Sequence, residues 1–286
     1  MPTINIISEI KKCVTFIFIK NRNGTTVANG TAFFVGVKNE GNPQVFNVYL
    51  VSAKHVLQDK NGNFYPEIGI RLNKNDGSSQ LILIPLTPEI KIHTHVEQEV
   101  DLALFSCLPD NKVYDFKFIQ DELVATQKTI MDFEICEGDD VFFAGLFTSY
   151  IGQQRNQPIT RFGKVALMPD EKIEWTEEGK GHQLLDLYLF EFQSFGGNSG
   201  SPAFFYLTPT RKPNQITIGS NIFLGGVVKG SFLTGNKIRL MAETENNVVS
   251  FENMGVTAVI PSQKLHEILF SKEIKEERLR SLEKKR

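Results

Sequence analysis

The segment best suited to chemistry in this chain is Gly197-Asn198-Ser199-Gly200-Ser201-Pro202. Glycines near Ser199 allow a sharp turn that exposes its hydroxyl. Backbone N–H groups in such a turn can donate to a negative oxygen that develops during a reaction. A serine beside donors of this kind is the arrangement that acyl transfer needs. We therefore take Ser199 as the candidate nucleophile.

A histidine and an aspartate precede Ser199 in a meaningful order. His55 ends the segment Ser52-Ala53-Lys54-His55 after an apolar run, and Asp101 opens the run Asp101-Leu102-Ala103-Leu104-Phe105. A near-neutral imidazole can take the proton of a serine hydroxyl, and a buried carboxylate can fix the tautomer of that imidazole. The order His, Asp, Ser excludes the α/β-hydrolase and subtilisin arrangements. Taken singly, each of these residues is also explained by a plain turn, a core histidine or a local cap.

At these residues the chain resembles the chymotrypsin-fold (trypsin-like) serine peptidases, and most closely the bacterial Deg/HtrA branch, over residues 13–265. Three further segments are similar to strands of that family: Gly30-Thr31-Ala32-Phe33-Phe34-Val35, Gly138-Asp139-Asp140-Val141-Phe142-Phe143-Ala144-Gly145 and Gly255-Val256-Thr257-Ala258-Val259-Ile260-Pro261. We expect no PDZ module of the kind that Deg/HtrA proteins usually carry, because few residues follow the last of these strands.

The resemblance implies a serine endopeptidase that uses His55, Asp101 and Ser199 as a triad. It places the oxyanion hole at the backbone N–H groups of Gly197 and Ser199. It implies no cofactor and no metal, and a protein or peptide as the substrate.

Short runs rich in β-branched and aromatic residues, separated by pairs such as Asn23-Gly24 and Asp76-Gly77, are typical of barrels and sandwiches. We predict an all-β fold of two six-stranded antiparallel β-barrels with a C-terminal α-helix, all in one peptidase domain spanning 1–286. The predicted strands are 13–20, 30–37, 46–53, 67–72, 80–86 and 100–106 in the first barrel, and 140–148, 159–167, 183–192, 200–207, 222–229 and 254–260 in the second. The first barrel then spans 13–106, the connection 107–137, the second barrel 138–260, and the helix with a charged tail 261–286.

Composition narrows the class of protein and its surroundings. The chain has 286 residues, 41% apolar content and 23 Phe, enough for a large core. A net charge of −2 without a basic stripe in 1–260 argues against nucleic-acid binding. Three cysteines, Cys13, Cys107 and Cys136, are too few for the disulfide framework of a secreted protease. No signal-peptide pattern or membrane-length apolar run is seen, so we expect a cytoplasmic protein with no membrane partner.

The family's substrate pocket can be placed relative to Ser199. Gln193 and Ser194 fall at its base, and Lys229-Gly230-Ser231 forms one wall. Because Gln193 is not acidic, we expect a small, polar or apolar side chain rather than Arg or Lys before the cleaved bond.

Asn198 stands where digestive enzymes carry an Asp that pairs with a new amino terminus. A neutral amide needs no buried ammonium partner. We therefore expect activity that does not depend on trimming of a leader peptide.

His93-Thr94-His95 places two imidazoles on one strand face, but no third ligand has a recognised metal spacing. We interpret this segment as an exposed polar strand edge. Cys107 and Cys136 are interpreted as buried apolar fillers, because neither lies in a glycine-rich nucleophile turn.

The predicted function is regulated intracellular cleavage of protein substrates. The alternative is a catalytically silent trypsin-like fold that serves as a protein-binding module. An esterase on the same fold differs only in the leaving group of its substrate. A regulatory partner protein, the oligomeric state and the role of the charged tail stay open.

Overall fold

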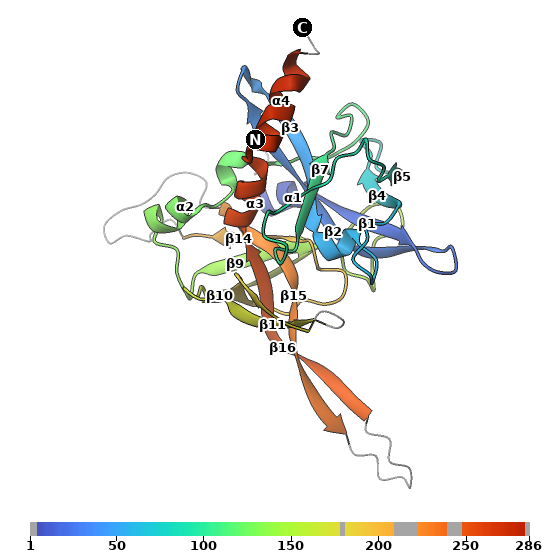
Figure 1. The fold of residues 1–286 in the computed structure, drawn as a ribbon. Coiled ribbons are helices and arrows are strands. Elements are labelled where there is room, and N and C mark those ends of the chain that lie inside the picture. Colours follow the sequence, from blue (N-terminus) through green and yellow to red (C-terminus); the bar gives the residue numbers. More distant parts are fainter. Residues whose placement is uncertain (1–4, 178–180, 209–221, 239–247, 284–286) are drawn as a thin grey trace.

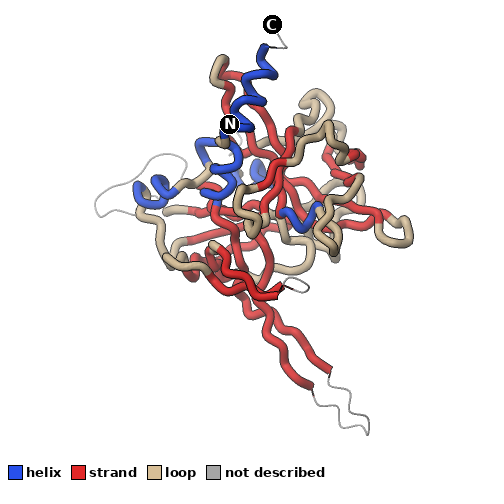
Figure 2. The backbone as a smooth tube through the Cα atoms, viewed as in Figure 1, coloured by secondary structure: helices blue, strands red, loops and turns tan. Residues whose placement is uncertain are grey.

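The computed structural model describes residues 5–177, 181–208, 222–238 and 248–283. These residues form a mostly β fold in which two large sheets lie against each other and a few short helices cover their edges (Figures 1 and 2). The mostly β prediction is confirmed.

The first sheet is built by the first half of the chain. Its eight strands are β1 (Val14–Lys20), β2 (Thr26–Asn39), β3 (Asn42–Ala53), β4 (Glu67–Asn73), β5 (Ser79–Pro85), β6 (His93–Thr94), β7 (Leu102–Ser106) and β8 (Ile119–Gln120). Hydrogen bonds order them β5-β4-β1-β2-β3-β7-β6, with β8 parallel to β2. All six strands predicted for the first barrel are present, and the two-residue strands β6 and β8 were not predicted. Strand pairing among the described residues leaves this sheet open, so closure of the first predicted barrel stays a prediction.

The second sheet is a closed barrel in the order β10-β13-β16-β15-β14-β9. Its six antiparallel strands are β9 (Asp140–Gly145), β10 (Ile159–Leu167), β13 (Tyr188–Glu191), β14 (Pro202–Tyr206), β15 (Ile222–Ile238) and β16 (Val248–Pro261). One six-stranded barrel of the prediction is therefore confirmed. β15 and β16 continue beyond it as a long paired arm, visible in orange in Figure 1, which the sequence pattern did not predict.

The predicted strand 183–192 is divided in the structure. Its first part belongs to β12 (Gly181–Leu185), which pairs with β11 (Ile173–Glu177) in a separate two-stranded sheet. The break falls at Asp186, whose carboxylate pairs with Lys264 of the C-terminal region at 3.1 Å. The two parts then pair with different strands, β12 with β11 and β13 with β10 and β16.

β2 lies between two apolar cores, which explains its unbroken hydrophobic run. Phe33 and Val35 pack in a core that also contains Phe142 and Phe204 of the barrel. Phe34, on the opposite face, packs in a core made by the first sheet. Since successive side chains of a strand point to opposite faces, β2 buries both of them. The strand therefore runs along the junction of the two sheets.

The helices are short and peripheral. They are α1 (Ile6–Lys11), α2 (Gln127–Asp132), α3 (Ser262–Leu269) and α4 (Lys272–Glu283). The predicted helix after Pro261 is present, and its apolar stripe, Leu265, Ile268 and Leu269, is buried as expected. Among the described residues, no helix has the length and apolar character needed to cross a membrane.

Docking of the C-terminal helices should contribute measurably to stability. Leu265 is fully buried, so Leu265→Ala should lower the free energy of unfolding by about 2–5 kcal/mol through lost transfer energy and a residual cavity. Leu279→Ala is the matched control, because Leu279 is 48% exposed and its loss should cost less than about 0.5 kcal/mol. Urea denaturation measures both values. Equal effects of the two substitutions would contradict the docked position of α3.

Candidate active site

Thr31, near the middle of β2, joins the first sheet to the turn that carries Ser199. Its backbone N–H donates to the carbonyl of Ser199 at 3.0 Å, and its hydroxyl donates to the carbonyl of Gly197 at 2.8 Å. The Ser52 hydroxyl, from β3, donates to the carbonyl of Thr31 at 2.7 Å. Because Thr31 is fully buried, these bonds are protected from competition by water. They fix the turn against the strands that lead to His55.

Glycine is required twice in this turn. Gly197 and Gly200 have φ angles of +94° and +84°, in the left-handed region that favours glycine. A Cβ atom at Gly200 would lie 2.1 Å from the carbonyl oxygen of Thr31, so the close approach of the two segments excludes a side chain. Within the described residues, the N–H groups of Gly197 and Ser199 donate to no other protein group. Both donors predicted for the oxyanion hole are thus left for a ligand.

Asn198 supports the turn from inside. Its buried side chain accepts a hydrogen bond from the N–H of Phe195 at 2.7 Å and donates one to the carbonyl of Leu146. A neutral amide thereby satisfies two backbone groups, and no buried charge is created that would need a counterion.

His55 and Asp101 are in direct contact. Nδ1 of His55 lies 2.6 Å from Oδ2 of Asp101, and the backbone N–H of His55 donates to Oδ1 at 2.9 Å. Pairing of β3 with β7 produces this approach, because His55 follows the end of β3 and Asp101 directly precedes β7. The side chain of Asp101 is 6% exposed, whereas that of His55 is 34% exposed. A buried carboxylate therefore orients an imidazole that solvent can reach.

Lys229, in β15, is a second partner of Asp101 that the sequence analysis assigned only to a pocket wall. Its Nζ lies 2.9 Å from Oδ2 of Asp101, and its side chain is 4% exposed. Burial alone would raise the pKa of Asp101, but the charges and hydrogen bonds of His55 and Lys229 outweigh it and hold that pKa well below its usual range. A lysine within the apolar run Val227-Val228-Lys229 was a signal for a buried ion pair. The sequence does not reveal which carboxylate it meets.

The β11–β12 hairpin lies beside this lysine. The centroid of the Trp175 ring is 5.5 Å from Nζ of Lys229, within the range of a cation–π contact. A Cβ atom at Gly230 would lie 3.6 Å from the same ring. Trp175 is the second residue near the site that sequence analysis missed, because a lone tryptophan in a short strand carries no positional signal.

The hydroxyl of Ser199 donates to the backbone carbonyl of Lys229 at 2.9 Å. Among the described residues, no hydrogen bond joins Ser199 to His55. The three predicted triad residues are nevertheless gathered around one lysine, whose carbonyl contacts Ser199 and whose ammonium contacts Asp101. A proton transfer from Ser199 to His55 would require the hydroxyl to turn from the Lys229 carbonyl toward the imidazole.

The residues predicted for the pocket divide into two groups. The Oγ atom of Ser194 lies 2.6 Å from Oγ of Ser231 and 2.8 Å from Oγ1 of Thr257, and the Ser231 hydroxyl also contacts the carbonyl of Ser194 at 2.7 Å. Uncharged hydroxyls therefore join Ser194, predicted at the base of the pocket, to Ser231, predicted in its wall. Gln193, predicted at the base of the pocket, is exposed, whereas its neighbours Phe192 and Ser194 are buried. It lies beyond the end of β13 at Glu191, and its place in the pocket stays a prediction.

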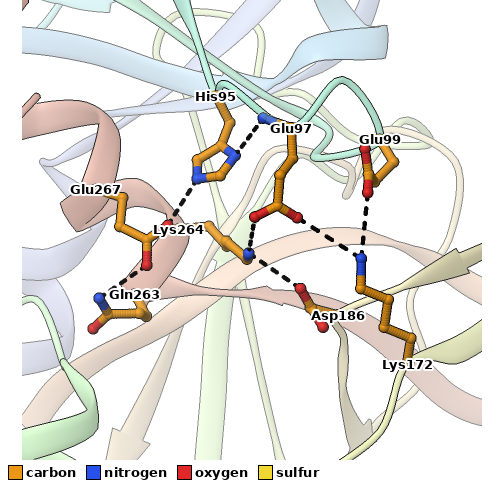
Figure 3. Close-up of polar contacts among 8 residues, drawn as sticks. All are labelled: His95, Glu97, Glu99, Lys172, Asp186, Gln263, Lys264 and Glu267. Atoms are coloured by element: carbon orange, nitrogen blue, oxygen red, sulfur yellow. Dashed lines mark hydrogen bonds and ion pairs between the residues drawn. The ribbon is translucent and has the colours of Figure 1, made fainter.

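The loop before Asp101 is tied to a residue beside the β11–β12 hairpin and to helix α3 (Figure 3). Nζ of Lys264 lies 2.8 Å from Glu97 and 3.1 Å from Asp186, and Nζ of Lys172 lies 3.3 Å from Glu99. These ion pairs connect three segments that are distant in sequence. They anchor the loop that presents Asp101, although partly exposed pairs contribute little each.

The interpretation of His93 and His95 as an exposed strand edge is wrong, because both side chains are buried beneath the C-terminal helices. Nε2 of His95 lies 2.8 Å from Glu267, as Figure 3 shows, and Nε2 of His93 lies 3.0 Å from Glu277. In the described part of the chain, the group His93, Glu273 and Glu277 has ligand atoms near enough to hold a metal ion. The ammonium of Lys91 contacts both glutamates and so occupies the position that a metal ion would need.

The three cysteines are free, and two of them, Cys13 and Cys107, are unsuited to nucleophilic chemistry at neutral pH. Burial raises the pKa of Cys13 to about 12 and that of Cys107 to about 11, so both thiols stay protonated. Cys136 is exposed rather than buried, which corrects the prediction for this residue. It lies in a turn where the N–H of Cys136 donates to Asp139.

No protein-family model and no curated protein matches the chain. Among solved structures, the chain is similar to the active form of the Rv3671c protease from M. tuberculosis, with 14% sequence identity and a TM-score of 0.46. The match covers 92% of this chain and 82% of that one. A likeness this distant carries no argument about fold or function, so the meaning of the site rests on its own geometry.

The depressed pKa of Asp101 predicts a pH-dependent contribution to stability. A carboxyl whose pKa is lower in the folded state stabilises the fold above its unfolded value of about 4, and this contribution is lost as the pH falls. At pH 7, Asp101→Asn should therefore be less stable than the parent chain by about 3 kcal/mol. At pH 3 the difference should shrink by about 1 kcal/mol.

Urea denaturation at the two pH values measures this difference. Asp170→Asn is the control, since Asp170 is exposed and its substitution should have nearly the same small effect at both pH values. A stability gap for Asp101→Asn that stays constant or widens in acid would contradict the assignment.

Proposed function

We propose that this chain is a serine endopeptidase of chymotrypsin-like architecture that uses His55, Asp101 and Ser199. The contact that carries the proposal is the 2.6 Å approach of His55 Nδ1 to the buried carboxylate of Asp101, beside a glycine turn that presents Ser199. Orientation of an imidazole by a buried carboxylate is what a serine nucleophile requires of its base. The order of the three residues along the chain and their position where the two sheets meet support the same function.

In the proposed reaction, the hydroxyl of Ser199 leaves the carbonyl of Lys229 and gives its proton to Nε2 of His55. Its oxygen forms a bond to the carbonyl carbon of the substrate. The imidazolium then gives the proton to the amine nitrogen, and the C–N bond breaks to leave an acyl-enzyme. After the amine leaves, His55 takes a proton from water, and the water oxygen forms a bond to the acyl carbon. The C–O bond to Ser199 then breaks, the carboxylic acid is released, and His55 returns the proton to the Ser199 oxygen.

The N–H groups of Gly197 and Ser199 are the proposed donors to the negative oxygen of each tetrahedral intermediate. The left-handed conformation of Gly197 and the bond from Thr31 to its carbonyl support this role, because they fix the peptide groups before substrate binds. Preorganised donors of this kind contribute in a typical peptidase about 3 kcal/mol of transition-state stabilisation each.

The proposed substrates are proteins in the cytoplasm, a compartment that suits three free thiols. A place in the Deg/HtrA branch remains part of the proposal. A catalytically silent binding fold is the second candidate, and the hydrogen bond of Ser199 to Lys229 instead of His55 is the observation that favours it.

Reaction with a fluorescent fluorophosphonate separates these two candidates. The probe reacts with a serine that a neighbouring base activates, so the parent chain should be labelled covalently at Ser199. Ser199→Ala should abolish labelling, and His55→Ala should slow it by at least about 100-fold. His182→Ala is the control, because the His182 side chain is 72% exposed and pairs with Glu174 rather than with a triad residue. An unlabelled parent chain that remains folded would support the silent candidate.

The hydroxyl cluster of Ser194, Ser231 and Thr257 predicts the preferred residue before the cleaved bond. Hydroxyls can accommodate a small uncharged side chain but offer no carboxylate to a cation. A peptide library should therefore yield cleavage after small polar or apolar residues, at least about tenfold faster than after Arg or Lys. Ser199→Ala measures cleavage by contaminating proteases. Strong selection of Arg or Lys would show that the pocket lies elsewhere.

A further inference from the structure

Lys229 contacts two of the three proposed catalytic side chains. Its ammonium lies 2.9 Å from Oδ2 of Asp101, the same oxygen that His55 Nδ1 approaches at 2.6 Å. Its backbone carbonyl oxygen accepts a hydrogen bond from the Ser199 hydroxyl at 2.9 Å. The side chains of Lys229 and Asp101 are 4% and 6% exposed, so water weakens this charge pair little.

We propose that Lys229 is a positioning residue that keeps His55 neutral, and so able to accept a proton, at lower pH than the contact with Asp101 alone would allow. Its importance for catalysis rests on the proposed peptidase function. Its effect on the charge of His55 is a property of the folded chain and can be measured without catalysis.

The physical reason is the shared oxygen. When His55 takes a proton, a second cation forms beside Oδ2 of Asp101, where the Lys229 ammonium already lies. Like charges a few ångströms apart disfavour the second charge, and burial strengthens their repulsion. The same ammonium donates to the carboxylate and so helps to hold its orientation. Lys229 therefore opposes formation of the imidazolium while it positions the group that orients the ring.

The other charged groups near the Asp101 loop balance one another. They lie on the loop itself, on the turn that carries His55, beside the β11–β12 hairpin and on α3, and they are Lys54, Glu97, Glu99, Lys172, Asp186 and Lys264. Five of them form the ion pairs drawn in Figure 3, and the ammonium of Lys54 donates to the carbonyl of Gln98 at 2.8 Å. All are more exposed than Lys229. Lys229 is therefore more buried than any of these six groups, and its ammonium contacts Asp101 directly.

An NMR titration tests the proposal directly. The imidazole signals of His55 are followed against pH in a Ser199→Ala chain, and they are assigned by comparison with a His55→Gln spectrum. Lys229→Gln removes the charge but keeps an N–H donor, and it should raise the titration midpoint of His55 by about one pH unit. In the chain with Ser199 intact, the same substitution should slow fluorophosphonate labelling at pH 5.5 by up to about tenfold and leave it little changed at pH 9.

Two controls separate charge from packing. Lys229→Arg keeps the charge and should leave the midpoint within about 0.3 pH unit of the parent value. Lys54→Gln removes the neighbouring, more exposed ammonium and should also change it by less than about 0.3 pH unit. If Lys229→Gln does not fold, Lys229→Met supplies a second neutral side chain of similar length.

An unchanged midpoint in a folded neutral variant would overturn the proposal. A His55 midpoint raised by a full pH unit in Lys229→Arg would also overturn it, because that variant keeps the positive charge. A parent chain that never reacts with the probe would instead remove the proposed peptidase function. The titration would still decide whether Lys229 controls the charge of His55.

Discussion

The buried carboxylate of Asp101 is the group on which the site depends. Isolated in an apolar interior, it would be protonated, but an imidazole and an ammonium share one of its oxygens and keep it ionised. Each partner comes from a different part of the chain. Asp101 and His55 lie at the ends of paired strands of the first sheet, and Lys229 lies on the barrel, so the charge is satisfied only when both sheets are in place.

Strand β2 supplies the apolar counterpart of this polar junction. One face of the strand packs with barrel residues such as Phe142, and the other with the first sheet. Thr31 then connects the same strand to the turn of Ser199 by two hydrogen bonds. The packing that holds the sheets together thereby also fixes the position of the nucleophile. The turn and β2 are held so close together that no side chain would fit at Gly200.

Features with a local cause were predicted well from sequence, and features that arise between distant segments were not. Alternating apolar runs gave the strands of both sheets, and the stripe of Leu265, Ile268 and Leu269 gave the helix after the barrel. The contact of His55 with Asp101 follows from motifs that each end or begin a strand. The ion pair of Lys229 and the burial of His93 and His95 depend on tertiary contacts that no local pattern encodes. The place of Gln193 in the pocket came from its spacing to Ser199 in the family and stays a prediction, because Gln193 lies outside the strands.

The claim that this arrangement cleaves proteins is tested most directly by identifying protein N-termini. A cell lysate is incubated with the parent chain or with Ser199→Ala, and the new N-termini are compared by mass spectrometry. The account predicts a set of cleavage sites that appears with the parent chain and is absent with the variant. Identical sets from a folded parent chain and its variant would contradict it.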